Sequence, residues 1–335
     1  MTAILYVLLA IVVAVAIWQM TSIFKLKSVI ATEKDNNIQG ILFALFGIFF
    51  YGLMIFSFVK YTSILLPEAA SLEGEDYDDL YVVTMSLILV VQAITQFLLF
   101  YFAFKYRGVK GRKALFYADS HKLEMIWTII PSIVLAGLVL YGLSVWIDVM
   151  DTSDAENPLI VEVYAKQFQW EARYAGEDNE LGLANVRNIK GINTMGVDMT
   201  DINSLDDIPV RELHLPKGRK VIFKFRSQDV LHSAYMPHFR AQMNCVPGMV
   251  TQFAFTPSMT TEEMRANDKT VAKVENINRI RAEKGEDEYV FDYVLLCNKI
   301  CGSSHYNMQM KIVVEEEDEF NTWLKSQKTM AQVVQ

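Results

Sequence analysis

The stretch CNKICGSSHYNMQMKIVVE, residues 297–315, gathers four side chains of the kind that bind soft metal ions. Cys297 and Cys301 are four residues apart, His305 follows four residues later, and Met308 follows three residues after that. The whole chain has only three cysteines and five histidines, so this spacing stands out. Alternating, β-rich runs lie on either side of the four side chains, YVFDYVLLC before and MKIVVE after. The motif is therefore predicted on a loop between two strands.

Thiolate, imidazole and thioether ligands together select a soft or borderline metal, and a methionine ligand indicates copper rather than zinc. A blue-copper site uses one cysteine, two histidines and a weak axial methionine for a single ion. Here two cysteines share one loop, and two thiolates can bridge two ions. A second histidine must come from elsewhere, and His232 in DVLHSAYMP lies at the end of a predicted strand. The motif predicts a binuclear copper centre for electron transfer, with Met308 and a backbone carbonyl between the cysteines as weak axial ligands.

Three alternatives to a copper centre stay open. A Cys2His2 zinc site is one, formed by Cys297, Cys301, His305 and His232. A single disulfide between the two thiols is another, with the histidine and the methionine incidental. A cysteine–histidine nucleophilic pair is the third, although the second nearby thiol would then have no role. The remaining cysteine, Cys245, is expected to be a small core residue.

The sequence around the motif predicts an all-β domain over residues 148–335. Short alternating runs separated by turn residues are typical of half-buried antiparallel strands in a sandwich or small barrel. Two long polar stretches interrupt them, at about residues 175–208 and 256–288, and the later half of the second has a helical pattern. Stretches of this length are expected to be functional excursions or partner contacts. A short helix is predicted in EEEDEFNTWLKSQ near the end of the chain.

The first 147 residues have a different character. Hydrophobic residues make up 52% of the chain, above the roughly 45–50% usual for soluble proteins. The excess lies in four uncharged runs of about the length that crosses a bilayer: residues 3–24, 38–59, 80–104 and 125–147. We expect a membrane anchor of four transmembrane helices. The first run could instead be a cleaved signal peptide, but no Lys or Arg precedes it and it is longer than a usual signal-peptide core.

Charge predicts the orientation of this anchor. The loop at residues 105–122 is strongly basic, three lysines follow the first run, and the loop between the second and third runs is acidic. Positive loops stay in the cytoplasm, so the N-terminus and the β-domain are both predicted outside. The first 147 residues hold ten acidic and ten basic side chains, so the net charge of −8 belongs to the exported domain. That charge favours solubility or the steering of a basic soluble partner; no nucleic-acid partner is expected.

With these motifs in place, the chain resembles subunit II of haem–copper cytochrome c oxidases. The family pattern C-x-E-x-C-G-x-x-H-x-x-M matches Cys297, Cys301, Gly302, His305 and Met308, and DVLHS matches its upstream histidine segment. HKLEMIWTIIPSIVL resembles the start of the family's last transmembrane helix, and VPGMVTQ resembles a P-G-R-x-x-Q segment more weakly. The resemblance covers about residues 80–324, apart from the two long polar stretches.

The resemblance implies a cupredoxin-like Greek-key sandwich carrying a binuclear CuA centre. Its implied ligands are His232, Cys297, the backbone carbonyl of Lys299, Cys301, His305 and Met308. The implied function is to accept electrons from cytochrome c and pass them to haem in subunit I, which would hold the haems and CuB, reduce oxygen to water and pump protons. The implied location is a bacterial plasma membrane with the β-domain on the periplasmic side. The two extra N-terminal helices are candidates for docking a neighbouring respiratory complex.

Several positions depart from the family pattern or carry further expectations. Lys299 replaces the glutamate between the cysteines and Asn244 replaces an aspartate, which argues against the magnesium or manganese ion of the family's subunit interface. Phe168 replaces the tryptophan of electron entry, and Trp170 fills the second aromatic position. Glu124 matches a carboxylate near a proton-pathway entrance, although a helix-start role favoured by the helix dipole is the alternative. A quinol oxidase-type subunit II and an exported copper-handling protein are the competing functions.

Overall fold

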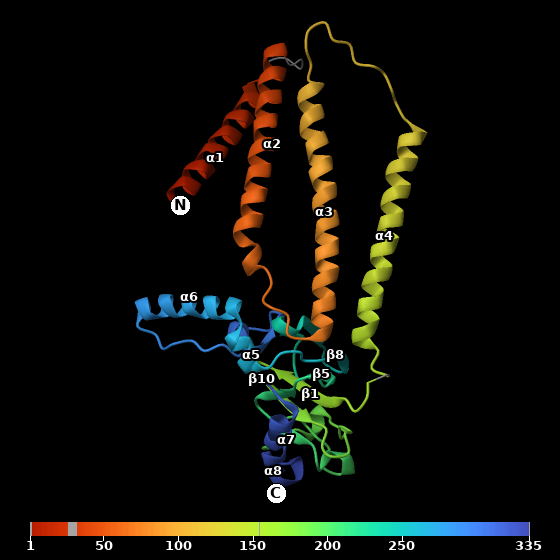
Figure 1. Ribbon diagram of the computed structural model, residues 1–335, viewed down its shortest axis with the longest axis vertical. Helices are drawn as coiled ribbons and strands as arrows, with labels where there is room; N and C mark the ends of the chain where they lie inside the picture. Colours follow the sequence, from red (N-terminus) through yellow and green to blue (C-terminus); the bar gives the residue numbers. More distant parts are fainter. Residues whose placement is uncertain (1, 26–31, 154, 335) are drawn as a thin grey trace. The chain divides into compact units, whose positions relative to one another are not determined.

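Four long helices precede a β-rich domain in this computed structural model, which describes residues 2–25, 32–153 and 155–334 (Figure 1). The chain divides into two compact units, residues 1–63 with 87–121 and residues 64–86 with 122–335. The second unit therefore contains the whole β-domain together with the start of the third helix and nearly all of the fourth. The four helices are α1 (Thr2–Lys25), α2 (Glu33–Tyr61), α3 (Leu72–Lys105) and α4 (His121–Met150).

Within the described residues, three of these helices, α2, α3 and α4, are long and apolar enough to cross a membrane. In α1 the apolar helix found within the described residues is Tyr6–Thr21, which is shorter than the length required of a membrane span. The fourth crossing therefore stays a prediction. The helix α3 begins at Leu72, eight residues before the predicted apolar run, because Ser71 caps its first turn and acidic Glu73 and Glu75 suit a helix N-terminus.

A glycine face on α2 lets it pack closely against α3 in the first unit. A Cβ at Gly47 would lie 2.8 Å from the Phe100 ring, so only glycine allows this approach. The Tyr51 hydroxyl donates to the backbone carbonyl of Ala93 at 2.7 Å. Small residues at helix contacts of this kind are typical of membrane helix pairs.

The β-domain is built from two five-stranded sheets. The first has the order β3-β2-β1-β5-β8 and the second β4-β10-β9-β6-β7. Most neighbours are antiparallel, and β1–β5 and β4–β10 are parallel pairs. The strands are β1 (Leu159–Lys166), β2 (Gln169–Tyr174), β3 (Ile208–Val210), β4 (Leu213–Pro216), β5 (Val221–Ser227), β6 (His232–Met236), β7 (Ala241–Cys245), β8 (Thr251–Phe255), β9 (Tyr293–Cys297) and β10 (Gln309–Glu315).

Alternating residues from both sheets form one apolar core. Phe223 and Phe225 of β5 are buried with Leu295 of β9 and Ile312 of β10. Side chains two apart on a strand point to the same face, so the alternation read from the sequence places these residues inward. The architecture is the predicted one, apolar helices followed by an all-β, cupredoxin-like sandwich.

The first long polar stretch covers the outer face of the first sheet. Met195 and Val197 pack on Tyr164, and Met330 of the C-terminal helix α8 (Met330–Val334) joins them. Beneath the same stretch, Arg173 pairs with the buried carboxylates of Glu162 and Asp207. Burial raises the pKa of Asp207 to about 7 although Arg173 opposes this.

The second long polar stretch contains two helices, α5 (Thr261–Ala266) and α6 (Asp268–Lys284). The helix α6 occupies the part whose pattern was helical, begins with an Asn267 cap and ends at Gly285 in the left-handed conformation. The predicted helix near the end of the chain is α7 (Glu317–Ser326).

Candidate metal centre

Strand pairing brings the distant histidine to the cysteine loop. Cys297 is the last residue of β9, and the loop from it returns to β10 through a short 3-10 turn at His305–Asn307. His232 is the first residue of β6, which pairs antiparallel with β9, with Ala234 opposite Cys297. Neighbouring antiparallel strands present the end of one beside the start of the other, so both side chains reach the same end of the sheet.

All six predicted ligand groups lie together. The Cys297 and Cys301 sulfurs are 3.9 Å apart, and His232 Nδ1 lies 3.7 Å from the Cys297 sulfur. The Lys299 carbonyl oxygen is 3.2 Å from the same sulfur. On the other side, His305 Nδ1 and the Met308 sulfur lie 3.6 Å and 3.8 Å from the Cys301 sulfur. Each sulfur thus has one imidazole nitrogen and one weaker donor as near neighbours.

The distances in this cluster bear on the alternatives for the motif, most directly on the disulfide. Both thiols are free, and their sulfurs are much further apart than the roughly 2.0 Å of a disulfide. A tetrahedral zinc site would gather four ligands around one point. Here His232 Nδ1 lies near the Cys297 sulfur and His305 Nδ1 near the Cys301 sulfur, and the ligand atoms of His232, Cys297 and Cys301 lie within 4.8 Å of one another. The cluster of two thiols with nearby imidazole and thioether donors is compatible with a copper site.

The centre is shielded from solvent except at its loop surface. His232 and Met308 are 0% and 1% exposed, and the two cysteines are less than one-tenth exposed. In contrast, Ile300 and Tyr306 are 86% and 87% exposed on the same loop. The loop therefore exposes Ile300 and Tyr306, together with polar residues such as Lys299, beside the buried ligands.

Groups that the sequence pattern did not single out support the ligands. Asp229 Oδ1 lies 2.8 Å from His232 Nε2, and because a carboxylate only accepts, Nε2 carries the hydrogen and Nδ1 is left free to bind metal. The Gln167 side-chain amide donates to the carbonyl of Cys301. Asp229 stands three residues before His232 in the quoted DVLHS, which is the signal that could have identified it.

The two aromatic candidates for electron entry lie at different depths. Phe168 is half-buried, and its ring packs so closely on Gly302 that a Cβ there would lie 2.7 Å from ring atoms. Gly302 also has a φ of +145°, a conformation that favours glycine. Trp170 is only 4% exposed, and its indole N–H donates to the Met308 carbonyl at 3.4 Å. Trp170 therefore lies beneath the loop, and a direct surface contact is available to Phe168 alone of the two.

The thiols are poised to exchange protons for metal. Burial raises the pKa of Cys301 to about 11, and the neighbouring Cys297 adds to the effect. Burial also raises the pKa of Cys245, which lies opposite His232 on β7, to about 12. A thiol with the pKa of Cys301 is protonated at neutral pH, so metal binding through this sulfur must release a proton. Cys245 is fully buried, as expected for a core residue.

The remaining predicted residues lie outside this cluster. The side chain of Lys299 is exposed on the loop, and Asn244 is exposed on β7. Glu124 lies in the first turn of α4 and is half-buried. Nothing in these positions tests the magnesium or proton-pathway expectations, which stay predictions.

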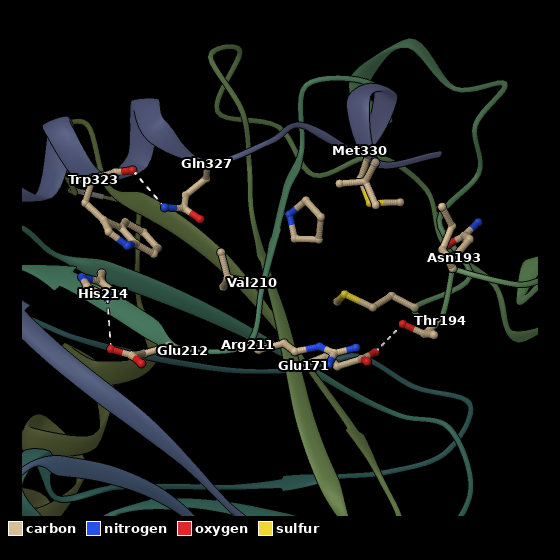
Figure 2. Close-up of a pocket in the computed structure, with 14 residues that line it drawn as sticks. Glu171, Asn193, Thr194, Val210, Arg211, Glu212, His214, Trp323, Gln327 and Met330 are labelled. Carbon is tan, nitrogen blue, oxygen red and sulfur yellow. Dashed lines mark hydrogen bonds and ion pairs between the residues drawn. The ribbon is translucent and has the colours of Figure 1, made fainter. Parts of the chain in front are cut away.

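A separate cavity of about 490 Å³ lies between the first long polar stretch, the β3–β4 connection and the C-terminal helices (Figure 2). Its lining includes Glu171, Arg211 and Met330, and His214 stacks on Trp323 with ring centroids 3.8 Å apart. None of the six predicted ligand groups is among its lining residues. The cavity is therefore separate from the predicted metal cluster.

Comparisons with known proteins agree on one family. The family model described as cytochrome C oxidase subunit II, transmembrane domain, matches residues 59–145. The alternative cytochrome c oxidase subunit 2 of Bradyrhizobium diazoefficiens is 35% identical over 234 residues, covering 69% of this chain and 73% of that protein. The cytochrome c oxidase subunit 2 of Thermostichus vulcanus is 22% identical over 295 residues, covering 80% of each.

Solved structures with a detectable likeness have related descriptions. The periplasmic domain of subunit II of cytochrome oxidase from Bradyrhizobium japonicum is 18% identical, with a TM-score of 0.31 over 50% of this chain and 91% of that one. A chain of a heme-copper terminal oxidase dimer is 15% identical, with a TM-score of 0.32 over 59% of this chain and all of that one.

Proposed function

Because the chain belongs to the cytochrome c oxidase subunit 2 family, we propose that its β-domain holds a binuclear copper centre that receives electrons from a cytochrome c. The electrons would pass to haem in subunit I for reduction of oxygen to water coupled to proton pumping. The chain is a component of an oxidoreductase complex and associates with other subunits. It is a membrane protein with an outer domain, and we place it in a bacterial plasma membrane with that domain in the periplasm.

The observation that carries the proposal is the pairing of each cysteine sulfur with its own imidazole nitrogen, at 3.7 Å and 3.6 Å. His232, Cys297, the Lys299 carbonyl, Cys301, His305 and Met308 would hold the copper. When bound, copper supplies a reversible one-electron couple. The protein contributes rigidity: Asp229 fixes the His232 ring, and Gln167 and Trp170 bond to loop carbonyls. These contacts hold the ligands in one geometry. Such a site suits electron transfer, because the ligands then move little between oxidation states.

Electron entry is proposed at the exposed surface of the copper loop. Phe168 packs on Gly302, the residue after Cys301, and its side chain is partly exposed. The net charge of −8 on the exported domain favours approach of a basic partner. A soluble or tethered cytochrome c with a basic face has the complementary charge.

Copper loading of the full-length chain tests this proposal. We expect two copper ions per chain and a mixed-valence EPR spectrum in which one unpaired electron is shared by both ions. The assembled oxidase should then oxidise reduced cytochrome c. A four-line spectrum of a single copper, or uptake of one zinc and no copper, would contradict the binuclear centre. Normal copper binding with oxidation of quinol but not of cytochrome c would retain the site and reject the donor.

A further inference from the structure

The segment between α2 and α3 is part of the β-domain. The Ala70 N–H donates to the His238 carbonyl at 2.7 Å, and the Ser258 N–H donates to the Ala70 carbonyl at 2.9 Å. The Leu72 N–H donates to the Thr256 carbonyl at 3.0 Å. Ala70 is fully buried in the main core. Backbone pairing on two sides makes this segment behave as an additional short strand, so α3 starts from a fixed point on the domain.

The first turn of α3 approaches the domain closely. The Glu73 carboxylate accepts from the Thr256 N–H at 2.7 Å and from the Thr256 hydroxyl at 3.1 Å. A Cβ at Gly74 would lie 2.6 Å from the Ser71 hydroxyl oxygen and 3.2 Å from Cγ of Arg240. Glycine at position 74 is what allows the helix to come this near to Arg240.

Arg240 joins the domain to the helix with a bidentate ion pair. Its Nε and Nη2 donate to the two oxygens of Asp78 on α3, both at 2.7 Å. The same guanidinium donates to the carbonyls of Pro67 and Pro237, at 2.7 Å and 2.8 Å. The Arg240 side chain is 10% exposed. Bidentate, partly buried pairs of this kind fix orientation as well as distance.

The backbone at Arg240 indicates that the side chain is needed there. Arg240 has a φ of +53°, in the left-handed region that glycine adopts readily and that is strained for other residues. An arginine persists in such a conformation when its surroundings hold it, and strained positions of this kind concentrate where geometry serves function. Four hydrogen bonds from one guanidinium offset the cost.

Strand pairing connects this ion pair to the strands that carry candidate copper ligands. Arg240 lies between β6 and β7, and these strands pair along their whole length, from Met236 opposite Ala241 to His232 opposite Cys245. The strand β6 pairs in turn with β9, which ends at Cys297. The chain of contacts therefore runs from α3, through Arg240, to two of the strands that carry ligands.

We propose that the Arg240–Asp78 pair is a positioning device that holds the copper-bearing sheet on α3 and so fixes the path by which electrons leave the centre. Arg240 and Asp78 are positioning residues, since neither touches a ligand. The inference rests on the proposed function. Electron transfer to a fixed acceptor depends on separation and orientation, and a helix shared between the domain and the membrane is the natural reference for both.

The test uses the assembled, copper-loaded oxidase with Asp78→Asn and Arg240→Gly. Both variants should slow the transfer of electrons from reduced copper to haem by about tenfold, because the rate falls steeply when the donor is misplaced relative to its acceptor. Copper content and the EPR spectrum should stay unchanged, because the ligands are intact. Exchanging the two charges in Arg240→Asp combined with Asp78→Arg should recover part of the rate. The matched control is Asp292→Asn, which removes a carboxylate bonded to Arg265 at 2.7 Å within the domain itself.

The outcomes separate this inference from the proposed function. Parental copper-to-haem rates in both variants would overturn the positioning role. Equal slowing in Asp292→Asn would also overturn it, because the effect would then be general softening of the domain. Glycine is the better residue for the backbone at 240, so a slow Arg240→Gly complex with an undisturbed copper spectrum supports a role for the side chain. Failure of the unaltered complex to bind copper would reject the proposed function instead.

Discussion

Removal of the Asp229 carboxylate should weaken copper binding without removing any ligand. In Asp229→Ala the Nε2–H of His232 loses the acceptor that lies 2.8 Å away. His232 is fully buried, so water cannot replace the carboxylate readily. The free chain can relieve the loss by moving the hydrogen to Nδ1. The loaded chain cannot, because Nδ1 is the nitrogen directed at the metal site.

The size of the effect follows from this asymmetry. A buried donor left without an acceptor costs about 1–3 kcal/mol, and this cost destabilises mainly the copper-loaded chain. At about 1.4 kcal/mol for each tenfold change, copper affinity should fall by about 5- to 140-fold. Loss of outer partners of metal-binding histidines has effects of this order. Asp229→Asn keeps one acceptor oxygen, so its copper affinity should lie between those of the unaltered chain and Asp229→Ala.

A competition titration against a copper chelator, followed by the EPR signal of the full-length chain, measures the change. The control is Asp198→Ala, which removes a carboxylate bonded only to the N–H and hydroxyl of Thr200, at 3.0 Å and 2.7 Å. The control should bind copper as tightly as the unaltered chain. Unchanged affinity in Asp229→Ala would refute the reasoning that the carboxylate selects the tautomer of His232.

Three further outcomes are expected. Met308→Leu should keep both coppers but shift the reduction potential and slow electron delivery, because a thioether is a weak ligand. Cys297→Ser should instead abolish the binuclear EPR signal. Complete loss of copper from Met308→Leu, with a normal centre in Cys297→Ser, would contradict this ranking of the ligands. Phe168→Ala should slow the oxidation of cytochrome c, measured over a range of salt concentrations. Trp170→Ala should slow it too and should also lower the thermal stability, because it leaves a cavity in the core beneath the loop. Normal turnover and stability in both variants would contradict these roles. Burial lowers the pKa of His238 to about 4, so as the pH falls the unfolded chain takes up a proton on this histidine before the folded chain does. The free energy of unfolding should therefore fall by up to about 3 kcal/mol between about pH 6.5 and pH 4. A denaturation series over this pH range should show a smaller decrease for His238→Gln.

Local sequence was sufficient for the features that depend on near neighbours along the chain. Three apolar helices follow from runs of uncharged residues, because a helix satisfies its own backbone hydrogen bonds. The cysteine loop follows from spacing, since Cys297, Cys301, His305 and Met308 lie within twelve residues. The strands that frame it alternate between apolar and polar residues, which indicates a two-sided sheet.

Tertiary structure was needed for contacts between residues far apart in the chain. The pairing of β6 with β9 puts His232 beside Cys297, 65 residues later. Its place at a predicted strand end, and then the family resemblance, made His232 a candidate ligand, but neither shows which strand lies beside the cysteines. The depth of Trp170 beneath the loop also depends on how β2 packs on the second sheet. Periodicity gives the face of a strand, but not which strand lies opposite or how far a side chain sits below the surface.

The contacts between the start of α3 and the β-domain are the clearest example of a feature that the local sequence pattern did not predict. The acidic residues before the third apolar run look like a solvated loop, yet Glu73 and Asp78 are helical and bonded to Thr256 and Arg240. These partners lie more than 160 residues away in the chain. Short-range pattern assigns such charges to solvent, because it contains no information on which distant donors the folded backbone brings within 3 Å of them.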